Sequence, residues 1–172
     1  FCDNYLELAK PILNGDDEAA KAETRATAAW TLDVAMKLLH PVMPFLTEEL
    51  WDKTAEFGPK PDGLLISARW PDLPDSYADA AAADEIDWLT GLIGEIRAVR
   101  SEMNVPPSAR PSLTLSGADA DSSARLARHR DLIVSLGRLG EVKEADAAPE
   151  GSVPFVAGEA TASLAIAQFV DL

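Results

Sequence analysis

The stretch LLHPVMPFLTEELW at residues 38–51 decides the fold, because it has the pattern of a helix end, a tight apolar corner and a second helix start. Pro41 disfavours helical geometry at His40, so the first helix should stop there. Pro44 prevents one continuous helix through the corner. We expect Thr47 to cap the second helix, whose first turn then carries two glutamates where the helix dipole favours negative charge. The stretch therefore predicts two helices held at a fixed angle.

The apolar side chains of this corner are too numerous to face water together, and we expect them to be buried. They are Val42, Met43, Phe45, Leu46, Leu50 and Trp51. We also expect Trp30, on the preceding helical pattern, to lie in the core rather than to serve as a platform for a nucleic-acid base. Burial on this scale predicts a helical bundle.

Three segments, in order, resemble the helical anticodon-binding domain of class I aminoacyl-tRNA synthetases, and the valyl members most closely. Residues 38–51 resemble the family signature LLHPxMPFxTEELW. FCDNYLE at residues 1–7 is similar to the lead-in FCDWYLE, with Asn4 in place of the usual aromatic residue. IRAVRSEMNVPPS at residues 96–108 is similar to the valyl segment IRxxRxEMNVPPS. The matches therefore extend from residue 1 to residue 108 of the 172.

The resemblance implies a role in translation. In the resembled enzymes the whole chain joins valine to its tRNA with ATP, and the helical domain holds the anticodon stem-loop. It implies that this chain binds the tRNA(Val) anticodon stem-loop beside an upstream catalytic domain of the same polypeptide. The HIGH and KMSKS signatures of that catalytic domain are absent here. We therefore expect no catalytic residue and no cofactor in this chain, with ATP used by the parent enzyme.

Composition is consistent with a folded piece of a longer cytoplasmic protein. A hydrophobic content of 47% supports a packed core and argues against disorder. No apolar run approaches the ~20 residues of a membrane span, and no signal peptide is evident. The chain does not begin with Met, and we interpret it as an excised region of a longer protein. The family resemblance implies that a C-terminal coiled-coil arm would follow it. The single Cys2 excludes an internal disulfide and a cysteine-rich zinc site. We expect a monomer.

The residue pattern predicts a mainly α fold, with a helical bundle over residues 1–105 and a small α/β subdomain over 106–172. The resemblance implies that the bundle is of the anticodon-binding type. The expected helices cover residues 1–13, 16–39, 47–57, 84–103 and 123–139, and Asp16 or Asp17 should cap the second of them. The expected strands cover 112–115, 141–145, 153–157 and 160–167. Gly158 and Glu159 should form a hairpin turn, which gives a β-α-β-β unit. We expect His129, on the apolar stripe of the last helix, to be partly buried and hydrogen-bonded, with no metal partner at a useful spacing.

The candidate binding residues lie near the end of the helix predicted over residues 84–103. Arg97, Arg100, Ser101 and Asn104 fall at i, i+3, i+4 and i+7, so they share one face. Two guanidiniums and an amide could grip phosphates or a base edge. Alternatively, the arginines satisfy the last carbonyls of the helix, pair with acids, or join the bundle to the small subdomain. Lys53, Lys60 and Arg69 are weaker phosphate candidates, and no metal site is expected.

The net charge of -14 conflicts with nucleic-acid binding, which requires Lys and Arg. Residues 97–143, however, carry eight basic against five acidic residues, so this segment has a charge of +3 and the remainder -17. Two alternatives stay open. The chain could belong to an isoleucyl or leucyl relative, although EMNVPPS favours the valyl type. It could instead be an acidic helical brace or protein-interaction domain that binds no RNA, which the overall charge favours.

Overall fold

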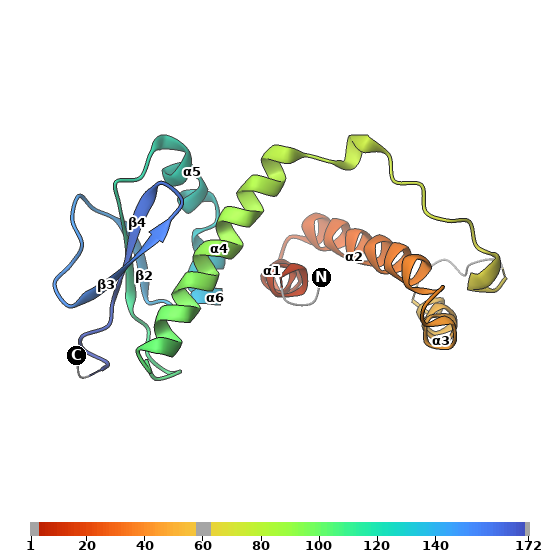
Figure 1. The fold of residues 1–172 in the computed structure, drawn as a ribbon, viewed down its shortest axis with the longest axis horizontal. Helices are drawn as coiled ribbons and strands as arrows, with labels where there is room; N and C mark the ends of the chain where they lie inside the picture. Colours follow the sequence, from red (N-terminus) through yellow and green to blue (C-terminus); the bar gives the residue numbers. More distant parts are fainter. Residues whose placement is uncertain (1–3, 58–62, 171–172) are drawn as a thin grey trace. The chain divides into compact units, whose positions relative to one another are not determined.

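A computed structural model describes residues 4–57 and 63–170, which form six α-helices, two short 3-10 helices and four strands (Figure 1). By its contacts the chain divides into two units. The sheet unit is Phe1–Leu8 with Asp79–Leu172, and the helical unit is Ala9–Ala78. Helix α1 spans Tyr5–Leu13. The predicted fold class, mainly helical with a small α/β part, is confirmed, whereas the domains predicted at 1–105 and 106–172 stay a prediction.

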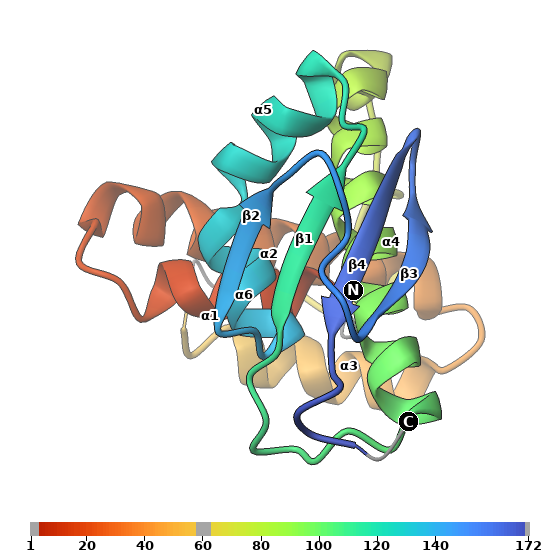
Figure 2. The same cartoon turned by 90° about the vertical axis from the view of Figure 1, so that its left-hand side faces the viewer.

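The sheet unit contains one long helix and the predicted β-α-β-β arrangement. Its elements are α4 (Ala80–Glu102), β1 (Ser112–Ser116), α5 (Ala120–Arg128), α6 (Arg130–Gly137), β2 (Glu141–Glu144), β3 (Ser152–Ala157) and β4 (Ala160–Ala165). The strand order is β2-β1-β4-β3, with β1 parallel to β2 and antiparallel to β4. The connection from β1 to β2 runs through α5 and α6, as a parallel pair requires. Figure 2 shows α4, α5 and α6 behind one face of this sheet.

The core of the sheet unit lies between the sheet and its helices. Leu113 and Leu115 of β1 are fully buried, and they pair with Leu164 and Ala162 of β4 on the same face. Buried side chains of α4 and α6 pack into the same cluster, among them Leu89, Ile93, Ile96 and Ile133. The long helix is therefore part of the same core as the strands.

Two helix boundaries in the sheet unit differ from the prediction. The helix expected from residue 84 begins at Ala80, because Asp79 accepts a hydrogen bond from the Ala82 N–H at 3.0 Å and the alanines that follow favour helix. The single helix expected over residues 123–139 is two helices that meet at His129. There the backbone leaves helical geometry, with φ -103° and ψ 12°.

The helical unit is built from two helices around the corner at residues 40–43. Its elements are α2 (Glu18–Leu39), α3 (Pro44–Thr54), and the 3-10 helices η1 (Leu65–Ser67) and η2 (Asp75–Tyr77). The predicted cap at residue 16 or 17 is confirmed as Asp17, which accepts from the Ala19 and Ala20 N–H groups at 3.0 and 3.1 Å. α2 ends at Leu39, beside His40 as predicted, but the reason given for this end is wrong: His40 keeps helical geometry, with φ -53° and ψ -40°, and its N–H donates to the Met36 carbonyl.

Thr47 was expected to cap α3, and this is wrong. The helix begins at Pro44, which tolerates the first helical position because the missing N–H has no partner there anyway. Thr47 is buried inside the helix, where its hydroxyl donates to the Met43 carbonyl at 2.9 Å. Since that proton is used, the His40 Nδ1–H donates to Thr47 Oγ1 at 2.8 Å. This pair links the end of α2 to the start of α3.

Most of the corner's apolar side chains are exposed, contrary to prediction. Trp51 is buried with Met36 and Leu65, but Phe45 is 92% exposed and Val42 is 78% exposed. Met43, Leu46 and Leu50 are also exposed. The physical reason is that two helices and a short connection cannot enclose both faces of an apolar corner. The segment that follows α3 is held to this helix by a hydrogen bond, in which the Leu65 N–H donates to the Glu48 carboxylate at 2.8 Å.

Trp30 was predicted in the core, but it is exposed and meets Tyr77 edge-on, with ring centroids 5.6 Å apart. Lys60 and residues 1–3 of the lead-in motif lie outside the described residues. In the described part of the chain, no helix has both the length and the apolar character that crossing a membrane would take.

Candidate nucleic-acid interface

Asn104 is the residue that stops α4. The Val105 N–H donates to the Arg100 carbonyl at 2.9 Å, and the Asn104 N–H donates to the Ser101 carbonyl at 3.2 Å. This pair of bonds is the Schellman pattern, which needs a residue in the left-handed region directly after the helix. Asn104 supplies it with φ 51°, and asparagine tolerates that region better than most residues. The left-handed backbone conformation that ends α4 therefore explains why an asparagine stands at this motif position.

Arg138 ends α6 in the same way. The Leu139 N–H donates to the Val134 carbonyl at 2.9 Å, and the Arg138 N–H donates to the Ser135 carbonyl at 3.3 Å. Arg138 has φ 51°, a region where a bulky residue without glycine's freedom is uncommon. Sequence reasoning missed this residue because the helix was expected to continue to residue 139. The signal that could have found it is the Gly137-Arg138 pair at the end of an apolar stripe.

Arg100 joins these two helix ends. It is only 8% exposed, and its guanidinium donates to the Pro106 carbonyl at 3.2 Å and to the Ala109 carbonyl at 3.3 Å. It also donates to the Arg138 carbonyl at 3.4 Å. Burial, and then the charges of Arg110 and Arg138, lower the pKa of the Arg100 guanidinium. This geometry favours the alternative in which Arg100 joins α4 to the small α/β part, while its contact with RNA stays a prediction.

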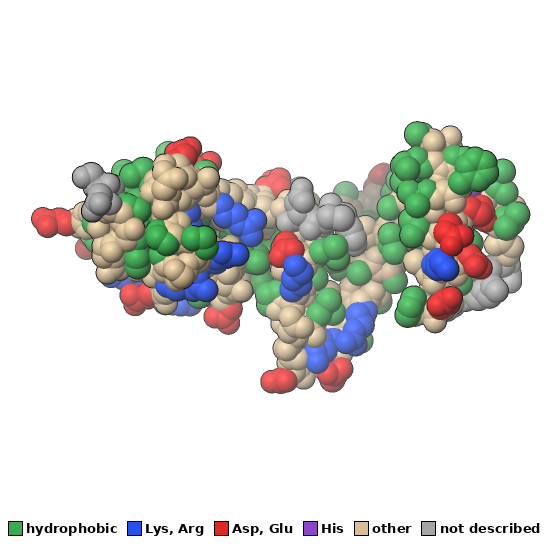
Figure 3. Space-filling view, turned by 90° about the horizontal axis from the view of Figure 1, so that it is seen from below, with side chains coloured by type: hydrophobic (Ala, Val, Ile, Leu, Met, Phe, Trp, Pro, Cys, Tyr) green, Lys and Arg blue, Asp and Glu red, His purple; other side chains and the backbone are tan. Residues whose placement is uncertain are grey.

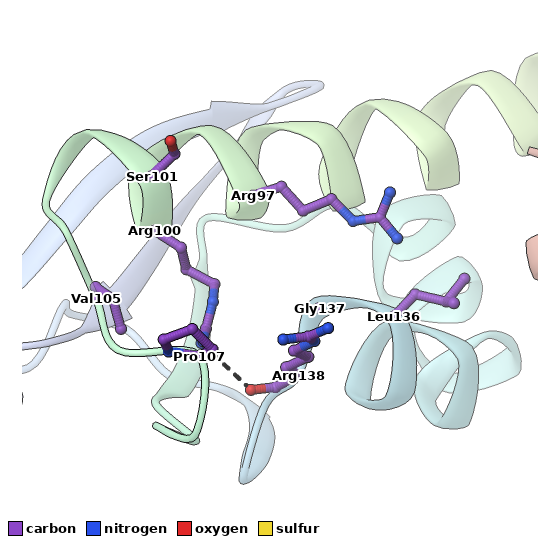
Figure 4. Close-up of a pocket in the computed structure, with 8 residues that line it drawn as sticks. All are labelled: Arg97, Arg100, Ser101, Val105, Pro107, Leu136, Gly137 and Arg138. Carbon is purple, nitrogen blue, oxygen red and sulfur yellow. Dashed lines mark hydrogen bonds between the residues drawn. The ribbon is translucent and has the colours of Figure 1, made fainter. Parts of the chain in front are cut away.

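Arg97 and Arg138 line an open hollow of about 350 Å³ between α4 and the end of α6. The lining residues are Arg97, Arg100, Ser101, Val105, Pro107, Leu136, Gly137 and Arg138. In Figure 4 the side chains of Arg97 and Arg138 extend into the space between the two helices. Both residues are exposed, and within the described residues neither forms a salt bridge with a carboxylate. The hollow is therefore positively charged and open to solvent.

The weaker candidates lie in the helical unit. Lys53 is exposed on α3 and lies 3.6 Å from the Glu49 carboxylate one helical turn earlier, while Arg69 is exposed after η1. Of the predicted set, Arg97, Arg100 and Asn104 are brought together at the end of α4, and Lys53 and Arg69 belong to the other unit. Figure 3 shows several Lys and Arg side chains gathered on one face of the sheet unit.

His129 is partly buried and hydrogen-bonded, as predicted. Its Nε2–H donates to Glu85 Oε1 at 2.6 Å, and Arg128 donates to the other oxygen of this carboxylate at 2.6 Å. The hydrogen bonds from Arg128 and then His129 lower the pKa of Glu85. This cluster links α4 to the junction of α5 and α6. Among the residues described, no three His, Cys, Asp or Glu side chains are grouped so that they could hold a metal ion.

Comparison with known proteins decides the family. Residues 1–115 match the family described as the anticodon-binding domain of tRNA ligase. The chain belongs to this family. The match covers α1 to α4 and ends inside β1, so the sheet of this anticodon-binding chain lies mostly beyond it.

The similarity of this anticodon-binding chain to its relatives covers its whole length. It is 67% identical over 172 residues to a valine–tRNA ligase of Caulobacter vibrioides, and 54% and 52% identical to those of Rhizobium meliloti and Mesorhizobium japonicum. Each alignment covers 100% of this chain but only 18–19% of the relative. The chain thus spans about a fifth of the length of these proteins. The resemblance to the valyl type of class I aminoacyl-tRNA synthetases, inferred from the three motifs, is confirmed.

Proposed function

We propose that this chain is the part of a valine–tRNA ligase that holds the anticodon stem-loop of tRNA(Val). The observation that carries the proposal is the family match over residues 1–115, combined with 67% identity to a protein of that name along the full chain. An upstream catalytic domain of the same polypeptide would perform the ATP-dependent aminoacylation. This region would bind no cofactor of its own, and the parent enzyme would act in the cytoplasm as a monomer.

The helical unit exposes flat side chains of the kind that an anticodon loop can use. Anticodon bases are unpaired, so they can stack on flat side chains and be read on their edges. The helical unit exposes Phe45 at 92% and Phe57 at 90%, and Trp70 is also exposed. Each base stacked on such a ring contributes about 1–3 kcal/mol.

The sheet unit supplies the positive charge that phosphates need. Arg97, Arg110 and Arg138 are exposed around the buried Arg100. They lie in the segment from residue 97 to residue 143, which carries +3 in a chain of net charge -14. A local basic surface of this kind attracts nucleic acid, although the acidic remainder weakens long-range attraction. Binding should therefore depend strongly on salt.

The test is a salt titration of RNA binding by the 172-residue chain. The two probes are a tRNA(Val) transcript and the same transcript with a substituted anticodon. We expect tighter binding to the unaltered transcript by about 10-fold or more, the discrimination that one or two lost base contacts would produce. Equal binding to both transcripts would overturn the proposal. Equal weak binding would favour the second candidate, an acidic brace, which the net charge of -14 and the exposed apolar corner support.

A further inference from the structure

We propose that the hollow between the ends of α4 and α6 binds one backbone phosphate of the RNA, held jointly by Arg97 and Arg138. Arg138 is assigned here a role that no motif of the sequence indicates. The inference rests on the proposed function, since it names the part of the RNA that this surface contacts. A phosphate contact of this kind positions the RNA and carries no sequence information.

Arg138 is held in place by its own backbone. The two hydrogen bonds that end α6 fix its N–H and that of Leu139, and Arg100 fixes its carbonyl. The backbone at φ 51° is one that most side chains avoid, so an arginine here is maintained at a conformational cost. A strained residue fixed on both sides and directed into a hollow suggests a binding role. The backbone from which the Arg138 side chain extends is thereby fixed.

Arg97 faces the same hollow from the opposite wall. It lies one turn before Arg100 on α4, a helix whose apolar side is anchored by the fully buried Ile96. Its side chain is exposed and extends toward α6 (Figure 4). Two guanidiniums on rigid helix ends can each donate to the oxygens of one phosphate, and arginine suits such bidentate geometry better than lysine.

The surroundings favour an anion as the ligand. Arg100 uses its donors on three carbonyls, so its positive charge stays in the wall of the hollow while it is not itself free to bind. Arg110, the fourth arginine of the group, donates to the Pro107 and Ala109 carbonyls at 3.4 Å. Like charges close together repel, and a bound phosphate would relieve that repulsion. Because the hollow is open, it admits a phosphodiester that continues on both sides.

The test compares four forms of the 172-residue chain: wild type, Arg97→Ala, Arg138→Gly and the double variant. Glycine at residue 138 removes the side chain yet suits φ 51°, so the melting temperature should stay within about 2 °C of wild type or rise. Each single variant should bind the tRNA(Val) transcript about fivefold more weakly near 0.1 M salt. The slope of log K against log salt should become shallower by about one.

The double variant decides whether one phosphate is shared. If both arginines hold the same phosphate, the double variant loses little more slope than either single variant, because neighbouring contacts are not additive. If the slope of log K against log salt becomes shallower by about two in the double variant, the two arginines hold separate phosphates and the proposal is overturned. The matched control is Arg130→Ala, which removes the same charge from the exposed first residue of α6. An equal effect from that control would also overturn it.

The failures of the two proposals can be told apart. If the wild type prefers tRNA(Val) but Arg97→Ala and Arg138→Gly bind as it does, the hollow is not a phosphate site and the proposed function stands. If the wild type binds both transcripts equally, the proposed function fails. The slopes of the variants still decide the hollow, because both transcripts carry the same backbone. An absence of any binding by the wild type overturns both.

Discussion

The sheet unit and the helical unit use apolar residues differently. The sheet unit encloses its large side chains between four strands and three helices, so that Leu89, Ile96 and Leu113 are fully buried. Among its described residues, the helical unit buries a small cluster of Met36, Trp51 and Leu65 and leaves Phe45 and other apolar side chains exposed. The difference teaches that an apolar pattern reports what can be buried, while the number of surrounding elements decides what is buried.

A core truncation in the sheet unit should give the largest effect. Ile96→Ala removes a fully buried side chain that packs against the sheet, and we expect a loss of about 3–4 kcal/mol in the free energy of unfolding. Urea denaturation, with amide hydrogen exchange of residues 112–116, measures it. The comparison partner is Phe45→Ala in the helical unit, which should cost less than about 0.5 kcal/mol because the ring is already exposed. A larger loss from Phe45→Ala would break the contrast.

The second test concerns the buried arginine. The motif alone would place Arg100 on RNA, but its position predicts that Arg100→Ala lowers the free energy of unfolding by about 3 kcal/mol. The reason is that the carbonyls of Pro106, Ala109 and Arg138 lose a charged donor inside the protein. Arg97→Ala is the control and should change stability by less than about 0.5 kcal/mol. Equal stability of the two variants would show that Arg100 does not join the helix ends.

A smaller effect is expected at the corner of the helical unit. Thr47→Val keeps the shape of the side chain but leaves the His40 Nδ1–H without its acceptor, at a cost of about 2 kcal/mol, while the Met43 carbonyl keeps its bond from the backbone N–H of residue 47. Thr31→Val, which removes an exposed hydroxyl bond to the Thr27 carbonyl, is the matched control and should be nearly neutral. Amide hydrogen exchange in α2 and α3 measures the difference in stability between the two variants. Similar protection in both variants would mean that the corner does not depend on this pair.

The smallest effect is a pH dependence confined to the sheet unit. The pKa of Glu85 is lowered by its hydrogen bonds, so its contribution to stability is complete above the usual carboxyl value of 4.5. It is lost as the pH falls below that value through the lowered pKa. Glu85→Gln should therefore reduce the melting temperature at pH 7, with a difference from wild type that shrinks below about pH 4.5. Melting curves between pH 7 and pH 3 test this, and parallel profiles would contradict it.

The sequence was most informative where local chemistry alone controls the structure. The Asp17 cap and the hairpin turn at Gly158 and Glu159 depend on neighbouring residues only, and both were predicted correctly. The hydrogen-bonded state of His129 was also predicted, although its partner Glu85 lies 44 residues away and had no signal in the sequence.

The errors share a different origin. Threonine is a residue type that commonly caps helices, but α3 begins at Pro44, so Thr47 lies inside the helix. The exposure of Phe45 depends on which elements surround the corner, which no local pattern contains. Arg138 enters the candidate site only because α6 ends at Gly137 and turns the chain toward α4. The motif therefore predicted which residues lie at the end of α4. Only the structure shows that Arg100 is buried and joins the helix ends while Arg97 is exposed.

The order of strands has a consequence for biosynthesis. β1 lies between β2 and β4, and both of its partners come later in the chain. During translation residues 112–116 therefore have no partner on either edge until β2 has left the ribosome, and one edge stays unpaired until β4 follows at residue 165. An unpaired strand with leucines at alternate positions is prone to intermolecular pairing. A nascent chain stalled before β4 should therefore be a preferred client of chaperones.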